Sequence, residues 1–92
     1  MSVAPELLEA VRDLLDAAQT TAPEELITRA ETLRARIEEA LFGANDAEAL
    51  GLLNDAVVSA LLHSRAVRQG DAERAEECLE QARLFAKAAA SR

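Results

Sequence analysis

Residues 46–69 are the stretch that most constrains how this chain folds. On a helical wheel that turns about 100° per residue, a broad apolar stripe is centred on Leu53 and contains Ala49, Leu50, Val57, Ala60, Leu61, Ser64 and Val67. Val58 and Leu62 lie on the opposite side of the same wheel. A helix that is apolar around most of its circumference is packed by neighbours on several sides. The stretch is therefore predicted to be the central helix of a small bundle.

Apolar residues spaced three and four apart predict two helices ahead of this stretch, over residues 4–20 and 23–42. The start of the second helix carries a local signal. Thr21 is followed three residues later by Glu24, which fits a capping box at a helix N-terminus. Gly43 is expected to end this helix in a left-handed backbone conformation.

Short polar residues and a glycine mark the ends of the two later helices. Asn45 or Asp46 is expected to cap the central helix, because both side chains accept a hydrogen bond from a first-turn N–H. Gly70 is expected to end the central helix, and Asp71 to cap the last one. That last helix is predicted over residues 71–88, before a tail of alanines with no larger apolar side chain to anchor it.

Gly51 is the one glycine predicted to lie inside a helix. Glycine in a helix interior costs about 1 kcal/mol relative to alanine. We expect a structural reason, a close crossing by a neighbouring helix. A ligand that approaches the backbone at this point is the functional alternative.

Composition and link lengths complete the fold prediction. Ala, Leu, Glu and Arg dominate the 92 residues, and all four favour helix. The links between the predicted helices are short, which makes successive helices antiparallel neighbours. We expect a single helical domain over residues 1–92, an all-α four-helix up-down bundle whose third helix is the most buried. Because small residues bury little apolar area per contact, self-association is expected to add stability.

The charge of the chain narrows the class of partner. The formal net charge is −7 at pH 7, which argues against a general affinity for nucleic acid or for an anionic membrane surface. Cys78 is the only cysteine, so no internal disulfide can form. The start of the sequence lacks the basic and apolar segments of a signal peptide. A cytoplasmic location is the resulting expectation.

Acidic residues of the last helix are the only candidate metal ligands. Glu73, Glu77 and Glu80 share one face, and carboxylates at this spacing can bind a hard cation. A di-iron bundle site also needs Glu-x-x-His pairs, which the chain lacks, and Arg74 and Arg83 stand close enough in sequence to pair with the acids. We therefore predict a solvated acidic face and no metal or other cofactor.

His63 and Cys78 are the residues that could carry reaction chemistry. His63 has no nucleophilic partner that the sequence identifies, so a half-buried structural histidine is expected. Cys78 falls on the apolar face of its helix beside acidic neighbours, which predicts a buried, unreactive thiol. No phosphate-binding glycine loop or nucleophile elbow is present either. The chain is not expected to be an enzyme.

Asp55, Val58, Leu62 and Arg65 form a mixed apolar and charged strip on the far side of the central helix. Two interpretations are open. The strip packs against one of the first two helices within the chain, or it forms a self-complementary dimer seam. In a seam with two-fold symmetry, Asp55 of one chain meets Arg65 of the other.

The hairpin from residue 59 to residue 87 resembles a single tetratricopeptide repeat. The residues that carry the resemblance are the first-helix leucine, the turn and three second-helix residues, namely Leu62, Gly70, Asp71, Ala75, Leu79 and Ala82. The sequence departs from the family pattern at Ser59, His63 and Lys87, and no second copy stands upstream. The resemblance implies a repeat-like hairpin in the C-terminal half, and peptide or protein binding on a helical surface.

These observations lead to two hypotheses for function. The first is a non-enzymatic protein–protein interaction module, a small helical adaptor or chaperone-like subunit that forms a homodimer and binds a protein of unknown identity. Its contact residues are predicted on the far side of the central helix, at Asp55, Val58, Leu62 and Arg65. The alternative is an acidic inhibitor or immunity-type protein that neutralises a basic partner with Glu73, Glu77 and Glu80.

Overall fold

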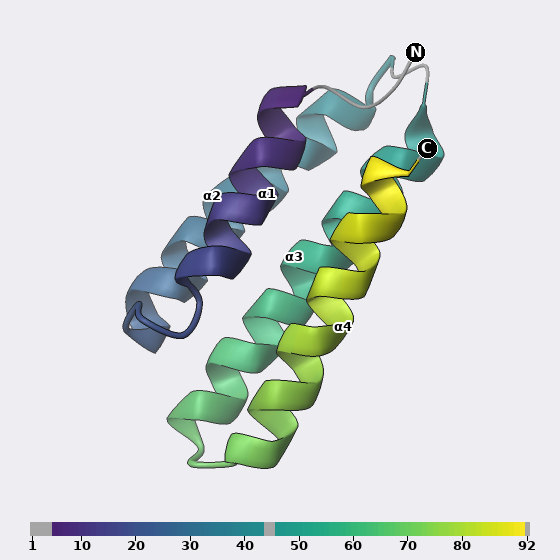
Figure 1. Ribbon diagram of the computed structural model, residues 1–92. Coiled ribbons are helices and arrows are strands. Elements are labelled where there is room, and N and C mark those ends of the chain that lie inside the picture. The colour runs from purple at the N-terminus through teal and green to yellow at the C-terminus, as the bar shows by residue number, and fades with distance from the viewer. Residues whose placement is uncertain (1–4, 44–45, 92) are drawn as a thin grey trace.

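The computed structural model describes residues 5–43 and 46–91, which fold into four helices without a strand among them (Figure 1). The helices are α1 (Pro5–Ala17), α2 (Pro23–Leu41), α3 (Ala47–Arg68) and α4 (Ala72–Ala90). Each runs opposite to the one before it. The predicted all-α up-down bundle is therefore confirmed.

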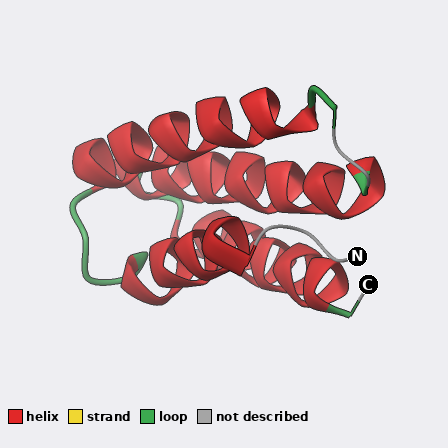
Figure 2. Cartoon of the chain, turned by 90° about the horizontal axis from the view of Figure 1, so that it is seen from above, coloured by secondary structure: helices red, strands yellow, loops and turns green. Residues whose placement is uncertain are grey.

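The four helices form a closed bundle in which α3 contacts all three of the others. Each helix packs on the next in sequence, α1 also packs on α4, and α1 and α3 meet across the middle, whereas α2 and α4 do not touch. The α3–α4 contact is the most extensive and the contacts of α1 are the smallest. The α1–α2 and α3–α4 links lie together at one end of the bundle (Figure 2). Of the four helices, α3 has the most buried residues, as predicted.

The core combines large side chains from every helix with small ones between α3 and α4. The largest apolar side chains that are fully buried are Val11, Leu14, Leu26, Ile37, Leu53, Val57 and Leu79. Alanines from α3 and α4 are also buried, namely Ala49, Ala56, Ala60, Ala66, Ala75, Ala82, Ala86 and Ala89. Small side chains allow two helix backbones to lie close together. The α3–α4 pair is therefore extensive in contact although its side chains are small.

The helix ends confirm most of the local predictions. The carboxylate of Asp46 accepts a 3.1 Å hydrogen bond from the backbone N–H of Ala49, and Asp71 caps α4 in the same way. Gly43 and Gly70 have φ angles of +80° and +77°, the left-handed region that favours glycine. The extents of two helices differ: α1 ends at Ala17 instead of residue 20, and α4 continues to Ala90, where the buried Ala89 holds it in place.

The predicted capping box at the start of α2 is wrong. The N-cap residue is Ala22, which makes no side-chain capping hydrogen bond. The Thr21 hydroxyl instead donates a 2.7 Å hydrogen bond to the backbone carbonyl of Ala17, the last residue of α1. The last carbonyls of a helix need partners as much as its first N–H groups do. Thr21 therefore completes α1 rather than opening α2.

The close helix crossing expected at Gly51 is also wrong. A Cβ atom added to this residue would have no atom of another residue within 4 Å. Gly51 is half-buried within α3 and its backbone is not approached by a neighbour. The helix therefore carries the propensity cost of glycine without a packing reason for it.

Candidate functional site

The strip on the far side of α3 is only partly covered within the chain. Asp55, Leu62 and Arg65 are exposed, and Val58 is half-buried. The Leu62 side chain is 37% exposed, although it belongs to the most buried helix of the molecule. The exposure of Asp55, Leu62 and Arg65 leaves the strip accessible to a partner, and the dimer seam stays a prediction. We call Asp55, Val58, Leu62 and Arg65 the α3 strip from here on.

The α3 strip has two apolar side chains between two opposite charges. Its members are spaced three, four and three residues apart, so they lie on one face of the helix, and the outer two are about 15 Å apart along the axis. Neither Asp55 nor Arg65 takes part in an ion pair within the described part of the chain; the ion pairs there join Arg34 to Glu38 and Arg68 to Glu24. The arrangement is self-complementary under a two-fold rotation.

The acidic residues of α4 form a second exposed surface. Glu73, Glu77 and Glu80 all lie in solvent, and none of them pairs with Arg74 or Arg83, contrary to the expectation from sequence spacing. Leu84 follows Glu80 by one helical turn and is 60% exposed. We call these four residues the α4 acidic face. It presents three free carboxylates beside one apolar side chain.

His63 is more deeply buried than predicted. Its side chain lies between α3 and α4, with the residue 5% exposed, and its Nδ1 atom is 2.7 Å from the backbone carbonyl oxygen of Ala75. A carbonyl oxygen only accepts, so Nδ1 carries the hydrogen of this bond. The ring thus ties the two helices of the C-terminal hairpin together, a role that depends on how α4 covers α3.

Cys78 is half-buried rather than buried. Its neighbours Glu76, Glu77 and Glu80 are exposed acids, a setting that does not favour the reactive thiolate. Among residues 5–43 and 46–91, no three His, Cys, Asp or Glu side chains are grouped so as to hold a metal ion.

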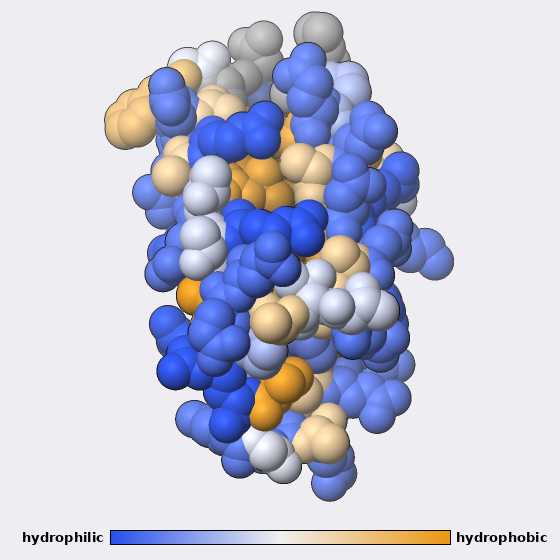
Figure 3. Space-filling view, turned by 90° about the vertical axis from the view of Figure 1, so that its left-hand side faces the viewer, coloured by the Kyte–Doolittle hydropathy of each residue, from blue (hydrophilic) through white to orange (hydrophobic). Residues whose placement is uncertain are grey.

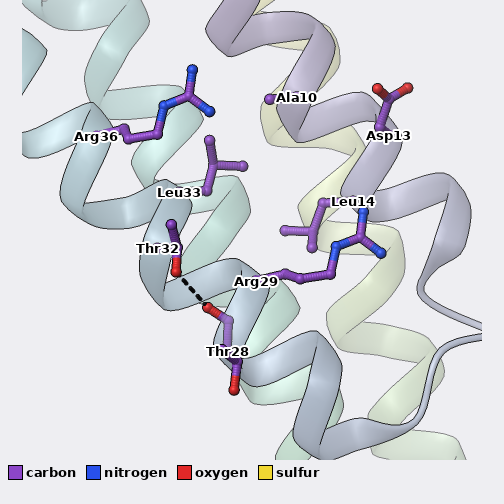
Figure 4. Close-up of a pocket in the computed structure, with 8 residues that line it drawn as sticks. All are labelled: Ala10, Asp13, Leu14, Thr28, Arg29, Thr32, Leu33 and Arg36. Atoms are coloured by element: carbon purple, nitrogen blue, oxygen red, sulfur yellow. Dashed lines mark hydrogen bonds between the residues drawn. The ribbon is translucent and has the colours of Figure 1, made fainter.

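A groove between α1 and α2 was not anticipated from the sequence (Figure 4). It has a volume of about 320 Å³, with Ala10, Leu14 and Leu33 as its apolar lining. Arg29 and Arg36 border it from α2, and Asp13 stands on the α1 side. Figure 3 shows the same side of the molecule as largely hydrophilic, with a hydrophobic hollow between strongly hydrophilic side chains. The groove exists only because of where α1 lies beside α2, which the sequence does not show.

Phe42 is the other exposed feature that sequence reasoning missed. It follows the last residue of α2 and is 88% exposed, the largest value among the exposed large apolar residues of the described chain. It lies one residue beyond the apolar seam of α2, ahead of the left-handed Gly43. The sequence position of Phe42 could have predicted its exposure, because a residue just beyond the apolar face of α2 is not directed into the core.

Comparisons with protein families, with curated proteins and with solved structures found no match. The resemblance to a tetratricopeptide repeat therefore stays a prediction. No helix in the described part of the chain combines the length and the apolar character needed to cross a membrane.

Proposed function

We propose that this chain is a non-enzymatic protein-interaction domain that forms a homodimer through the α3 strip. The observation that supports the proposal is the exposure of Leu62 and Arg65 on the helix that has the most buried residues of the four. A large apolar side chain that stays partly exposed on such a helix is stabilised when a second surface covers the remainder. The apolar and charged residues of the α3 strip determine what kind of surface can cover it.

A second copy of the chain is the partner that fits the strip best. Val58 and Leu62 supply an apolar centre, and the opposite charges of Asp55 and Arg65 stand at its two ends. In an antiparallel pairing of two α3 helices, each Asp55 faces an Arg65 while the apolar centres meet. Like charges would be opposed in a parallel pairing, which disfavours it. The predicted dimer is therefore antiparallel along α3.

Sedimentation velocity over a range of protein concentrations tests the dimer. Leu62→Asp places a charge in the apolar centre and should raise the dissociation constant at least about tenfold, or ~1.4 kcal/mol. Leu84→Asp is the matched control, because it makes the same change at an exposed leucine outside the strip and should leave the dimer intact. A wild-type protein that stays monomeric at several hundred micromolar contradicts the proposal, as does equal weakening by both substitutions.

The second candidate function is neutralisation of a basic protein by the α4 acidic face. It is favoured by the three unpaired carboxylates of Glu73, Glu77 and Glu80 next to the exposed Leu84. Such a surface steers a basic partner toward the chain, and the association weakens as salt is added.

Charge reversal separates this surface from the general acidity of the chain. A variant with lysine at Glu73, Glu77 and Glu80 is compared with one carrying lysine at Glu9, Glu25 and Glu39, which are exposed on α1 and α2. The two variants have the same net charge. Binding of an oligolysine peptide should be lost only in the first variant, and equal losses in both contradict a localised site.

A further inference from the structure

The end of the bundle that carries both hairpin links contains a hollow on either side of His63. One side has a volume of about 290 Å³ and lies against the α1–α2 link, and the other, of about 390 Å³, lies against the α3–α4 turn. Gln19, His63 and Val67 line both. The imidazole ring therefore stands at the boundary of the two spaces, and neither proposed function uses it.

The hydrogen bond of His63 to Ala75 fixes which ring nitrogen faces the hollow. Because Nδ1 donates to the Ala75 carbonyl on α4, a neutral ring carries its lone pair on Nε2. Nε2 is the other ring nitrogen, away from the bond to α4. It makes no hydrogen bond with the described residues, and it is not among the fully enclosed atoms that lack a partner. A basic nitrogen on a nearly buried residue is thus open to the hollow.

The hydroxyl groups around this nitrogen also act as acceptors. Thr21 donates its hydroxyl hydrogen to the Ala17 carbonyl, and Ser64 donates its own to the Ala60 carbonyl at 3.0 Å. A hydroxyl has one hydrogen to donate and two lone pairs. The oxygen of half-buried Thr21 therefore keeps lone pairs for a ligand that enters the hollow, whereas Ser64 is fully buried. Glu76 adds a carboxylate at the outer side of the second space.

The remaining lining is apolar or neutral. Ala18, Pro23, Leu26 and Val67 line the first space, and Ala72 and Ala75 continue this character in the second. Neither space is lined by a lysine or an arginine. An anionic ligand would find no positive charge there. A ligand that carries several N–H donors on an apolar body fits both the apolar lining and the hydrogen-bond acceptors.

We propose that the hollow around His63 binds an organic ammonium group carried on a short apolar chain. The ammonium donates to Nε2 of neutral His63 and to the Thr21 oxygen, while the chain lies against Leu26 and Val67. Glu76 and the net charge of −7 favour a cation at this end of the molecule. The same chemistry occurs in a free alkylamine and in the side chain of a lysine presented by a peptide.

Nuclear magnetic resonance of the imidazole nitrogens tests the site directly, because the chain has a single histidine. The full chain is titrated with n-butylammonium, and with butyrate and n-butanol as charge controls. At a pH where the ¹⁵N shifts report a neutral ring, butylammonium should move the Nε2 signal to saturation. Neither control should do so. When acid adds a proton to Nε2, the acceptor is lost, and the response to butylammonium should disappear even though Glu76 remains in place.

Substitutions separate this binding from non-specific attraction to an acidic protein. His63→Leu keeps an apolar side chain without the acceptor, and should weaken butylammonium binding at least about tenfold, followed by the backbone amide shifts of the α1–α2 link. If His63→Leu does not fold, Glu76→Gln is the substitute variant. Glu76 is exposed, so its replacement should leave folding unchanged and weaken butylammonium binding several-fold. Arg83→Gln, at a different groove of the bundle, is the control and should change nothing.

Two arms identify the natural source of the group. Nα-acetyl-lysine amide is compared with butylammonium, and tighter binding of the lysine derivative indicates a peptide side chain, whereas tighter binding of the alkylamine indicates a small metabolite. The proposal is overturned if butylammonium gives no saturable shift up to tens of millimolar. It is also overturned if butyrate produces the same shift as butylammonium.

Discussion

The two hairpins of this bundle are built in different ways. In the α3–α4 hairpin, small side chains bring the helices together along their length, both helices are capped by aspartate, and Gly70 forms the turn. In the α1–α2 hairpin the helices meet less extensively, α2 begins without a side-chain cap, and a groove remains between the pair. In the α3–α4 hairpin, helix capping and close packing favour the same structure. The α1–α2 hairpin depends instead on large leucines that reach into the shared core. We expect the α3–α4 hairpin to be the more stable unit.

The largest expected difference concerns leucine-to-alanine substitutions in the two halves. Leu53 in α3 and Leu14 in α1 are both fully buried, but only Leu14 borders a groove into which its surroundings can relax. Leu→Ala in a core costs about 2–5 kcal/mol depending on how far the site collapses. Urea denaturation should place Leu53→Ala near the upper end of this range and Leu14→Ala near the lower. Equal losses would mean that the two halves are equally rigid.

Helix caps provide the second test of the comparison. Asp71→Ala removes the hydrogen bond to the Arg74 N–H and should destabilise the protein by about 1 kcal/mol. Ala22→Asp supplies the cap that α2 lacks and should stabilise the protein by a similar or smaller amount, since the backbone of Ala22 already lies in the extended region. Thermal melts of the two variants measure both effects. If Ala22→Asp gives no gain, the start of α2 is satisfied in another way.

The smallest effects concern the two glycines of α3 and its turn. Gly51→Ala should stabilise the protein by about 1 kcal/mol or less, because the site is helical and nothing stands where the Cβ would be. Gly70→Ala should destabilise it by about 1 kcal/mol, because φ is +77° there and alanine is strained in that region. The denaturation midpoint should rise for Gly51→Ala and fall for Gly70→Ala. A loss at Gly51 would instead indicate that this face of α3 is covered in solution, as by a dimer partner.

The sequence was sufficient to predict those features that are decided within a few residues. Asp46, Asp71, Gly43 and Gly70 act where they were expected, because caps and left-handed turns depend on local hydrogen bonds and backbone sterics. The periodic apolar residues also gave the helices to within a few positions at their ends. Thr21 shows the limit of such reasoning. Its hydroxyl could bond to the end of α1 or to the start of α2, and the sequence did not reveal which.

Features that depend on where helices lie relative to one another could not be predicted. The depth of His63 depends on the cover that α4 provides, and the groove beside Arg29 depends on the position of α1. The exposure of Leu62 belongs to the same class, because a helical wheel gives the direction of a side chain without saying which neighbour occupies it. The residues of the α3 strip and the three glutamates of the α4 acidic face were predicted from the sequence, whereas the groove and the hollow around His63 were not.

The absence of contact between α2 and α4 has a consequence for regulation. The outer surfaces of these two helices are therefore separated from each other within the bundle. Any influence of one on the other must travel through the first or third helix. Substitutions on the two outer helices should accordingly have additive free energies, and a departure from additivity would identify the helix that relays the signal.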